Sequence, residues 1–206
     1  MVRVKICGIT NAADAGHAAR EGADALGFIF AKSPRRVEPR TVKKIVAAVG
    51  PFVATIGVFV DESEEKMLRT AEHCGLSGIQ LHGNENSRTV RRLQVRGFRV
   101  IKAFRAGEGM DVGQINETPA DAVLFDTAHS GKFGGTGVSF DWSCLKNVNA
   151  RVPWIVSGGL NPVNVKKLLS IFRPYGVDVS GGVEKTPGKK SEKLVREFIR
   201  NAKSAR

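Results

Sequence analysis

Residues 2–11 read VRVKICGITN, an alternating apolar stretch that ends in a cysteine and a glycine and is followed by a threonine and an asparagine. This pattern predicts a β-strand, a tight turn and the beginning of a helix. In an open doubly wound sheet, the first such turn normally carries the dinucleotide-binding sequence G-x-G-x-x-G. CGITN does not match that sequence, so this first unit favours a closed barrel over an open nucleotide-binding sheet.

The strand–helix unit recurs along the whole chain. Short apolar runs predict strands at residues 2–7, 25–30, 53–60, 78–82, 99–104, 122–126, 154–158 and 176–180. Helical patterns follow them at about 11–22, 39–49, 63–74, 86–96, 109–117, 142–148, 162–173 and 190–203. Successive strands begin roughly 21 to 32 residues apart, a spacing typical of βαβ units in a parallel sheet. Eight units predict an α/β fold, a single (β/α)8 TIM barrel in which residues 1–206 form one catalytic domain.

The strongly basic composition limits the kinds of molecule that the protein is expected to bind. The formal net charge is +12 and the sequence pI is about 10.0, which indicates either a nucleic-acid partner or an anionic small molecule. The basic residues are spread over the predicted helices, and RNP, zinc-finger and KH patterns are absent. We therefore expect a phosphorylated, anionic small-molecule substrate and no nucleic-acid partner. A basic nucleic-acid-binding protein is the alternative from another class.

Targeting and metal-binding patterns are also missing from the sequence. No apolar run approaches the roughly 20 residues of a membrane span, and the N-terminus lacks the pattern of a signal peptide. We therefore expect no membrane partner and a cytoplasmic protein. The three cysteines and four histidines follow neither a disulfide framework nor a zinc spacing, so no metal is expected. The sequence leaves open whether the protein is a monomer or a homodimer.

Two serine–glycine–glycine sequences follow the last two predicted strands, in VSGGLNP at 156–162 and VSGGVEKTPG at 179–188. Glycine lets backbone N–H groups approach an anion closely, and the N-terminus of a following helix adds positive charge. TIM barrels often bind phosphate with these two loops and a short extra helix, for which VEKT at 183–186 has a suitable length. Ordinary tight turns are the alternative. The expected phosphate-binding residues are Gly158, Gly159, Ser180, Gly181 and Gly182.

Several motifs in one order carry a resemblance that covers nearly the whole chain. They are VKICGIT (4–10), SPRRV (33–37), IQLHGNE (79–85), LFDT (124–127), GGTGVSFDW (134–142), SGGLNP (157–162) and VDVSGGVE (177–184). With these motifs the chain resembles the phosphoribosylanthranilate isomerase family of tryptophan biosynthesis. The resemblance implies a (β/α)8 barrel that needs no cofactor and no metal. It also implies an isomerase that performs the Amadori rearrangement of N-(5-phosphoribosyl)anthranilate to 1-(2-carboxyphenylamino)-1-deoxy-D-ribulose 5-phosphate.

The resemblance also implies roles for individual residues. Cys7 corresponds to the general base, Asp126 to the general acid and Arg36 to the ligand of the anthranilate carboxylate. The two glycine pairs correspond to the phosphate site. One departure is visible, because Gly181 stands where the family often has a second serine. Another phosphate-binding barrel, an isomerase or epimerase of sugar phosphates, is the alternative within the enzymes.

The alternation of side chains along a strand predicts a buried ion pair beneath the site. If Cys7 points into the barrel, Lys5 does so too. Asp178 and Ser180 share one face of the last strand, and the first and last strands are neighbours in a closed barrel. A lone buried lysine is costly, so we expect a Lys5–Asp178 pair, and we expect the same lysine to lower the pKa of Cys7.

Three further residues are expected to line the pocket. Gln80 and His82 share a face at the end of the fourth strand, where a histidine packed for structural reasons is the alternative. Gly135 belongs to the glycine-rich stretch after the sixth strand, where close approach to a ligand and a plain flexible loop both remain open.

Overall fold

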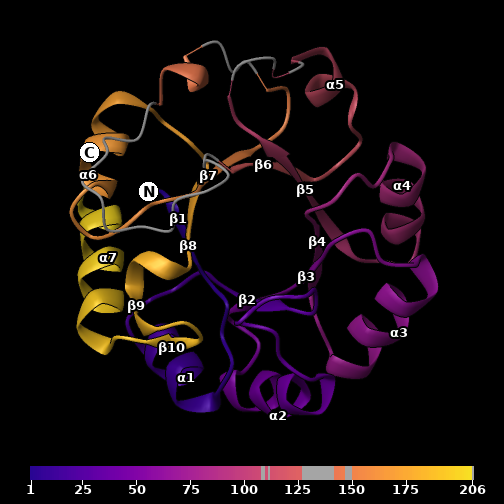
Figure 1. Ribbon diagram of the computed structural model, residues 1–206, viewed down its shortest axis with the longest axis horizontal. Helices are drawn as coiled ribbons and strands as arrows, with labels where there is room; N and C mark the ends of the chain where they lie inside the picture. The colour runs from indigo at the N-terminus through magenta and orange to yellow at the C-terminus, as the bar shows by residue number, and fades with distance from the viewer. Residues whose placement is uncertain (108–109, 111, 127–141, 147–149, 206) are drawn as a thin grey trace.

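The structure is a computed structural model that describes residues 1–107, 110, 112–126, 142–146 and 150–205. Eight parallel strands pair in sequence order and close into a barrel, because the eighth strand returns to pair with the first. Helices surround the barrel on the outside, as the view in Figure 1 shows. The predicted (β/α)8 architecture is confirmed.

The elements follow the predicted order. The barrel strands are β1 (Arg3–Cys7), β2 (Ala25–Ile29), β3 (Ala54–Phe59), β4 (Gly78–Leu81), β5 (Arg99–Arg105), β6 (Ala122–Asp126), β7 (Trp154–Ser157) and β8 (Gly176–Val179). The α-helices are α1 (Ala12–Arg20), α2 (Pro39–Val49), α3 (Glu64–Cys74), α4 (Ser87–Val95), α5 (Val112–Glu117), α6 (Val165–Ile171) and α7 (Glu192–Ser204). The short elements are the 3-10 helices η1 (Trp142–Leu145) and η2 (Gly181–Val183) and the strands β9 (Glu184–Thr186) and β10 (Lys189–Lys190).

The segment after β8 differs from the prediction. Residues 183–186 are predicted to form a short helix, but Glu184–Thr186 forms β9, which pairs antiparallel with β10. The prediction is wrong because Pro187 and Gly188 reverse the chain, and Gly188 has the positive φ of 80° that such a turn requires. The short extra helix lies earlier, as η2 at Gly181–Val183.

The two faces of the barrel strands carry different side chains. Outward residues such as Val4 and Ile6 are fully buried beneath the helices in the main hydrophobic core. Lys5, Gln80 and Asp178 are buried on the inner face instead. A separate apolar cluster is formed by Ala103, Ala122, Leu124 and Ile155. The interior is therefore a packed layer that includes charged and polar groups.

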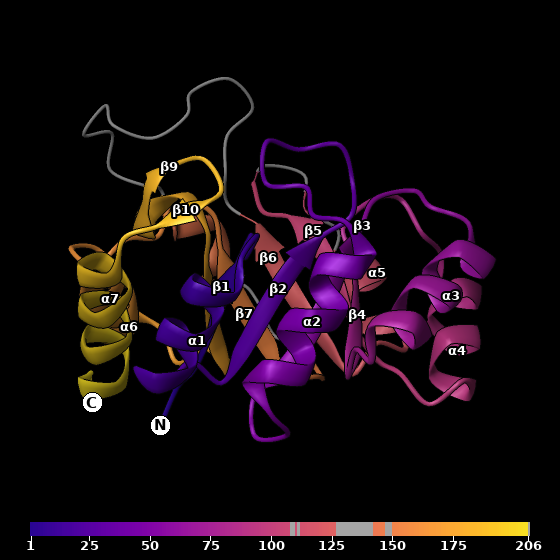
Figure 2. The same ribbon diagram turned by 90° about the horizontal axis from the view of Figure 1, so that it is seen from below.

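Helix α7 completes the ring of helices. It contacts both α1 and α6 and buries Val195, Phe198, Ile199 and Ala202, so the predicted closing helix is confirmed. Figure 2 shows the barrel from the side, with the N-terminus at one end and the β9–β10 hairpin at the other, where the strands finish. Among the described residues, no helix is long and apolar enough to span a membrane.

Candidate active site

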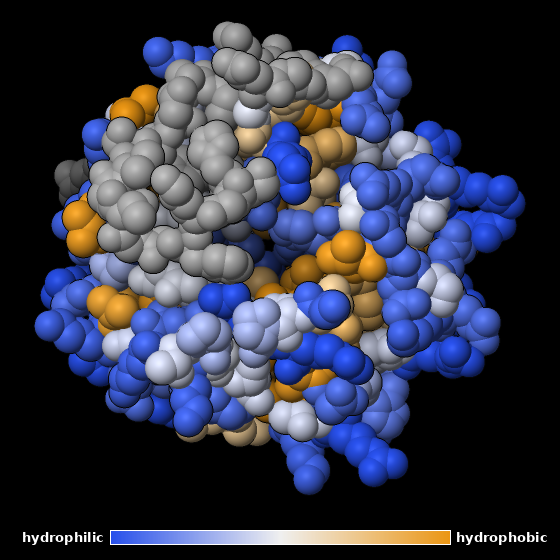
Figure 3. Space-filling model, in the orientation of Figure 1, coloured by the Kyte–Doolittle hydropathy of each residue, from blue (hydrophilic) through white to orange (hydrophobic). Residues whose placement is uncertain are grey.

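The candidate acid and base lie at the carboxyl ends of barrel strands. Cys7 is the last residue of β1, and Asp126 is the last residue of β6. Both alternate with residues of the outer core, so both face the interior. Figure 3 looks onto this end of the molecule and shows a hollow at its centre. In (β/α)8 barrels, this end carries the active site.

A buried ion pair lies beneath Cys7. The register of β1 and β8 places Lys5 opposite Asp178, and Lys5 Nζ lies 2.9 Å from Asp178 Oδ2 with both side chains 5% exposed. Gly27 of β2 provides the space, because a Cβ there would lie 2.7 Å from Cys7 Sγ and 3.1 Å from Lys5 Cε. The structure thus contains the pair that the alternation of side chains predicts.

The charges around Cys7 act in opposite directions. Burial raises the pKa of the Cys7 thiol above its ordinary value, the charge of Lys5 lowers it, and the charge of Asp178 raises it. The net pKa is raised, so the protein without substrate favours the neutral thiol. Burial lowers the pKa of Lys5, but the charges of Asp178 and Cys7 raise it more. Lys5 therefore acts on the thiol in the predicted direction, but it does not overcome burial.

Asp126 is hydrogen-bonded to a histidine. His82 Nε2 lies 3.1 Å from Asp126 Oδ2, and Gln80 Nε2 lies 2.8 Å from His82 Nδ1. When the Gln80 amide donates to Nδ1, the ring proton is on Nε2 and is donated to the Asp126 carboxyl group. The sequence predicts Gln80 and His82 only as residues that line the pocket, whereas the structure links His82 directly to the candidate acid and Gln80 to His82.

The two glycine loops pack directly against each other. Gly158 and Gly159 have φ angles of 89° and 61°, which favour glycine. A Cβ at Gly182 would overlap the carbonyl oxygen of Leu160. The Ser180 hydroxyl is buried and has no hydrogen-bond partner among the described residues. These loops therefore combine closely spaced backbone with a hydroxyl group that an anion could engage.

A buried charge cluster of Arg35, Glu184 and Lys190 lies beside these loops and is not predicted from the sequence. Arg35 Nε and Nη2 donate to both carboxylate oxygens of Glu184 at 2.7 to 3.0 Å. Lys190 Nζ lies 2.9 Å from Glu184 Oε1, and its side chain is 1% exposed. The available signal was the pair of lysines after VEKTPG. In the sequence, these lysines resemble the solvent-exposed charges of a helix. In the structure, the β9–β10 hairpin places Lys190 opposite Glu184.

Comparison with known proteins assigns the chain to a family. A family model described as N-(5′-phosphoribosyl)anthranilate (PRA) isomerase matches residues 4–201. The chain belongs to this family. The N-(5′-phosphoribosyl)anthranilate isomerase of Thermotoga neapolitana is 47% identical over 98% of this chain and 99% of its own length.

Solved structures agree with this assignment. A crystal structure of phosphoribosylanthranilate isomerase in complex with reduced 1-(o-carboxyphenylamino)-1-deoxyribulose 5-phosphate has a TM-score of 0.88 at 41% identity, covering 98% of this chain and 99% of that one. A structure of monomers generated from the dimeric isomerase of Thermotoga maritima has a TM-score of 0.85 at 38% identity, with the same coverage.

Arg36 is the residue that the PRA isomerase resemblance assigns to the substrate carboxylate. Its side chain is 57% exposed, and Arg36 Nη2 lies 3.3 Å from Glu38 Oε1. An exposed pair of this kind contributes little stability, so Arg36 can exchange Glu38 for another carboxylate at small cost. Its neighbour Arg35 turns the other way, to Glu184. Gly135 lies outside the described residues.

The described part of the chain shows no cluster of three or more histidine, cysteine, aspartate or glutamate residues that could hold a metal ion.

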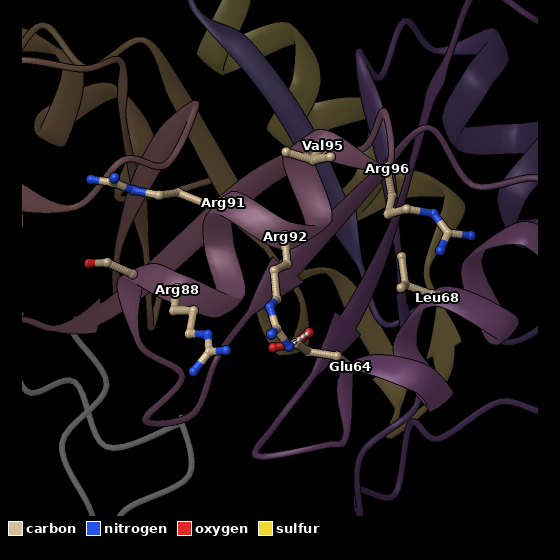
Figure 4. A pocket seen from close by; sticks show the side chains of 8 residues that line it. Glu64, Leu68, Arg88, Arg91, Arg92, Val95 and Arg96 are labelled. Atoms are coloured by element: carbon tan, nitrogen blue, oxygen red, sulfur yellow. Dashed lines mark hydrogen bonds and ion pairs between the residues drawn. The ribbon is translucent and has the colours of Figure 1, made fainter.

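A groove lies away from the candidate site, between α3 and α4 on the outside of the barrel. Figure 4 shows Arg88, Arg91 and Arg92 along α4 and Arg96 just after it, with Arg92 paired to Glu64 of α3. None of the expected PRA isomerase site residues lines this groove, so we treat it as part of the basic helical surface.

The departure at Gly181 is compatible with the local backbone. Gly181 does not have a positive φ, and a Cβ there would meet side-chain atoms only, Arg35 Nη2 at 3.2 Å and Glu184 Oε2 at 4.0 Å. A side chain at Gly181 is therefore tolerated, whereas one at Gly182 is not. Gly181 and Gly182 therefore differ in what they contribute to the packing of the two glycine loops.

This difference gives a matched pair of variants. We expect Gly182→Ala to push the two loops apart and to raise KM for the phosphorylated substrate about tenfold or more, equivalent to roughly 1.4 kcal/mol. Gly181→Ala is expected to change KM by less than about twofold, because the Arg35 side chain has to yield by only a few tenths of an ångström. Steady-state kinetics of the two purified variants measure the difference. Equal KM values for both variants would contradict the assigned role of the loops.

Proposed function

We propose that this chain, acting over residues 1–206 as one catalytic domain, converts N-(5-phosphoribosyl)anthranilate into 1-(2-carboxyphenylamino)-1-deoxy-D-ribulose 5-phosphate in tryptophan biosynthesis. The observation that carries the proposal is the inward position of Cys7 and Asp126 at the ends of β1 and β6. The glycine loops after β7 and β8 lie at the same end of the barrel. Membership of the PRA isomerase family supports it.

Asp126 acts first, as the general acid. In the substrate, the anthranilate nitrogen is bonded to C1′ of a ribofuranose ring. Proton donation from the Asp126 carboxyl group to the ring oxygen breaks the bond between C1′ and that oxygen, and the nitrogen lone pair forms a C=N bond. The His82 Nε2–H group, 3.1 Å from Asp126 Oδ2, orients the carboxyl group and stabilises the carboxylate that remains.

Cys7 acts second, as the general base. The positively charged C=N group makes the proton on C2′ acidic, and the Cys7 thiolate removes it to give an enolamine. The enolamine becomes the amino ketone when C1′ gains a proton and the C2′ hydroxyl loses one. Substrate and product are isomers, so protons and electrons balance without an added oxidant or reductant. Acid and base on different strands of one barrel suit these successive transfers.

Two anion sites hold the ends of the substrate. Backbone N–H groups of the glycine pairs at 158–159 and 181–182, with the Ser180 hydroxyl, bind the phosphate. Arg36 leaves Glu38 and binds the anthranilate carboxylate, for which a guanidinium group has matching geometry. Fixing both ends sets the reacting carbons between Cys7 and Asp126.

The direct test uses the purified chain and freshly formed N-(5-phosphoribosyl)anthranilate. The expected result is enzyme-dependent loss of the substrate's anthranilate fluorescence, with formation of the ribulose derivative identified by mass spectrometry. Loss at only the spontaneous rate would overturn the proposal. A sugar-phosphate substrate without anthranilate serves as the control, and turnover of that compound alone would favour the other phosphate-binding barrel enzymes.

Assembly and location stay predictions. A Thermotoga maritima relative is described as dimeric, and for this chain one or two copies are expected. Sedimentation equilibrium at several protein concentrations distinguishes a monomer from a homodimer. Cys7 and Cys74 are both free thiols, which accords with the expected cytoplasmic location, where thiols stay reduced.

A further inference from the structure

The role of Cys7 as a base leaves one requirement unmet. A free thiol titrates near a pH of about 8.5, and burial raises the pKa of Cys7 further above its ordinary value. The nearest cation, Lys5, is already paired with Asp178 in a bond of 2.9 Å. This pair is neutral as a whole, so it gives little net help to a thiolate. Another source of positive charge is needed.

The cluster of Arg35, Glu184 and Lys190 carries a surplus of positive charge. Glu184 is shared between two cations, with Arg35 Nη2 at 2.7 Å and Lys190 Nζ at 2.9 Å. One carboxylate cannot balance both, so the cluster has an excess of one positive charge. Burying an unbalanced charge is costly, and a nearby anion would reduce that cost.

The backbone connects this cluster to Cys7. Gly8, the residue after Cys7, has a φ of 74°, and a Cβ there would lie 2.7 Å from Arg35 Cδ and 2.9 Å from Ser180 Oγ. Lys190 Nζ donates to the carbonyl oxygen of Ser180 at 3.2 Å. The turn that follows the thiol therefore packs directly against Ser180, which accepts from Lys190, and against Arg35, which shares Glu184 with Lys190.

Three charged groups, Lys5, Asp178 and Lys190, shift the pKa of the Cys7 thiol. After burial, Lys5 lowers the pKa of Cys7, Asp178 raises it and Lys190 lowers it. Burial and the charge of Arg35 lower the pKa of Lys190, the charges of Glu184 and Cys7 raise it, and the net pKa is lowered. Asp14 of α1 accepts a hydrogen bond from the backbone N–H of Lys190, with Lys190 N 2.9 Å from Asp14 Oδ2.

From this geometry we infer that Lys190 is a positioning residue for the isomerisation: held by Glu184 and Ser180, it supplies the unbalanced positive charge that favours the thiolate form of Cys7. The inference rests on the proposed function for its catalytic meaning, because only a base needs a thiolate. The charge arrangement itself is independent of the reaction. Lys190 touches no reacting atom and acts through Cys7.

The test measures Cys7 ionisation directly. The rate of Cys7 carboxamidomethylation by iodoacetamide is followed against pH, with the modified peptide resolved by mass spectrometry. We expect Lys190→Met to move the profile by about one pH unit toward higher pH. Lys189→Met is the matched control, because Lys189 lies in the same strand, carries the same charge and is exposed. It should leave the profile unchanged.

A second variant is expected to shift the pH profile of Cys7 alkylation in the opposite direction. Glu184→Gln removes the carboxylate that partly balances Lys190, so the Cys7 profile should move toward lower pH. If Lys190→Met does not fold, this variant decides alone: a shift to lower pH supports the inference and an unchanged profile overturns it. A Lys190→Met profile that coincides with that of Lys189→Met would also overturn it.

Kinetics add a separate readout. For Lys190→Met, kcat/KM at pH 7 is expected to fall about tenfold and to recover as the pH rises. A loss that is equal at all pH values would indicate a structural role and contradict the inference. A wild-type chain that does not turn over N-(5-phosphoribosyl)anthranilate would overturn the proposed function, whereas the alkylation profiles would still test the charge cluster.

Discussion

Cys7→Ala and Asp126→Asn are each expected to lower kcat for the isomerisation by about 10²- to 10⁴-fold, the range of a single general acid or base. The alanine removes the group that takes the C2′ proton, and the asparagine amide cannot donate a proton to the ring oxygen. Stopped-flow or steady-state loss of anthranilate fluorescence measures both. KM should change much less, because neither group is assigned to holding the phosphate or the carboxylate.

The control for the thiol is Cys74→Ala. Cys74 is also a buried free cysteine, but it lies on α3 and its sulfur donates to the Pro39 carbonyl oxygen at 3.4 Å. Its loss should leave kcat within about threefold of the wild type. Near wild-type rates for both Cys7→Ala and Asp126→Asn would show that the acid and base are assigned to the wrong residues, even though the fold is correct.

Lys5→Met is expected to reduce the free energy of unfolding by about 3–5 kcal/mol, because it leaves the buried Asp178 carboxylate without its partner. Urea denaturation at neutral pH measures the change. The double variant Lys5→Met/Asp178→Leu should recover much of the loss, since replacing a buried ion pair by apolar residues is often close to neutral. If the double variant is no more stable than Lys5→Met, the unpaired carboxylate is not the cause.

A matched control lies two residues away on the same strand. Arg3 forms an ion pair with Asp24, but its side chain is 62% exposed, so Arg3→Met should hardly move the urea midpoint. The Lys5 effect also has a defined pH window. Because the folded pKa of Lys5 is raised above 10.5, its stabilising contribution is complete below pH 10.5 and is lost as the pH rises through the folded pKa.

Local patterns in the sequence predict the barrel and part of its site. Period-two alternation puts Lys5 and Cys7 on one face, and strand order makes β1 and β8 neighbours, so the partner of Lys5 follows from topology. Strand-end position alone does not predict that His82 contacts Asp126, because the contact joins side chains 44 positions apart. The lengths and rotamers of those side chains decide it.

The charge cluster could not be predicted for a different reason. Neighbouring arginines in SPRRV look equivalent in sequence, yet Arg35 is largely buried against Glu184 and Arg36 is exposed. The hairpin of β9 and β10 brings Lys190 to the same carboxylate. Its turn is local, but the burial of Lys190 depends on where the hairpin packs, which is a property of the whole barrel end.

The ion pair between β1 and β8 also has a consequence for the order of events during synthesis. Lys5 and Asp178 are separated by 173 positions, and a ribosome adds about 5–20 residues per second. Strand β1 is therefore made roughly 9 to 35 seconds before its partner β8 exists. Throughout that interval, the nascent chain carries an unmatched lysine and a reactive sulfur on a strand that has one free edge. Closure of the barrel therefore has to wait for β8, the last barrel strand to be made.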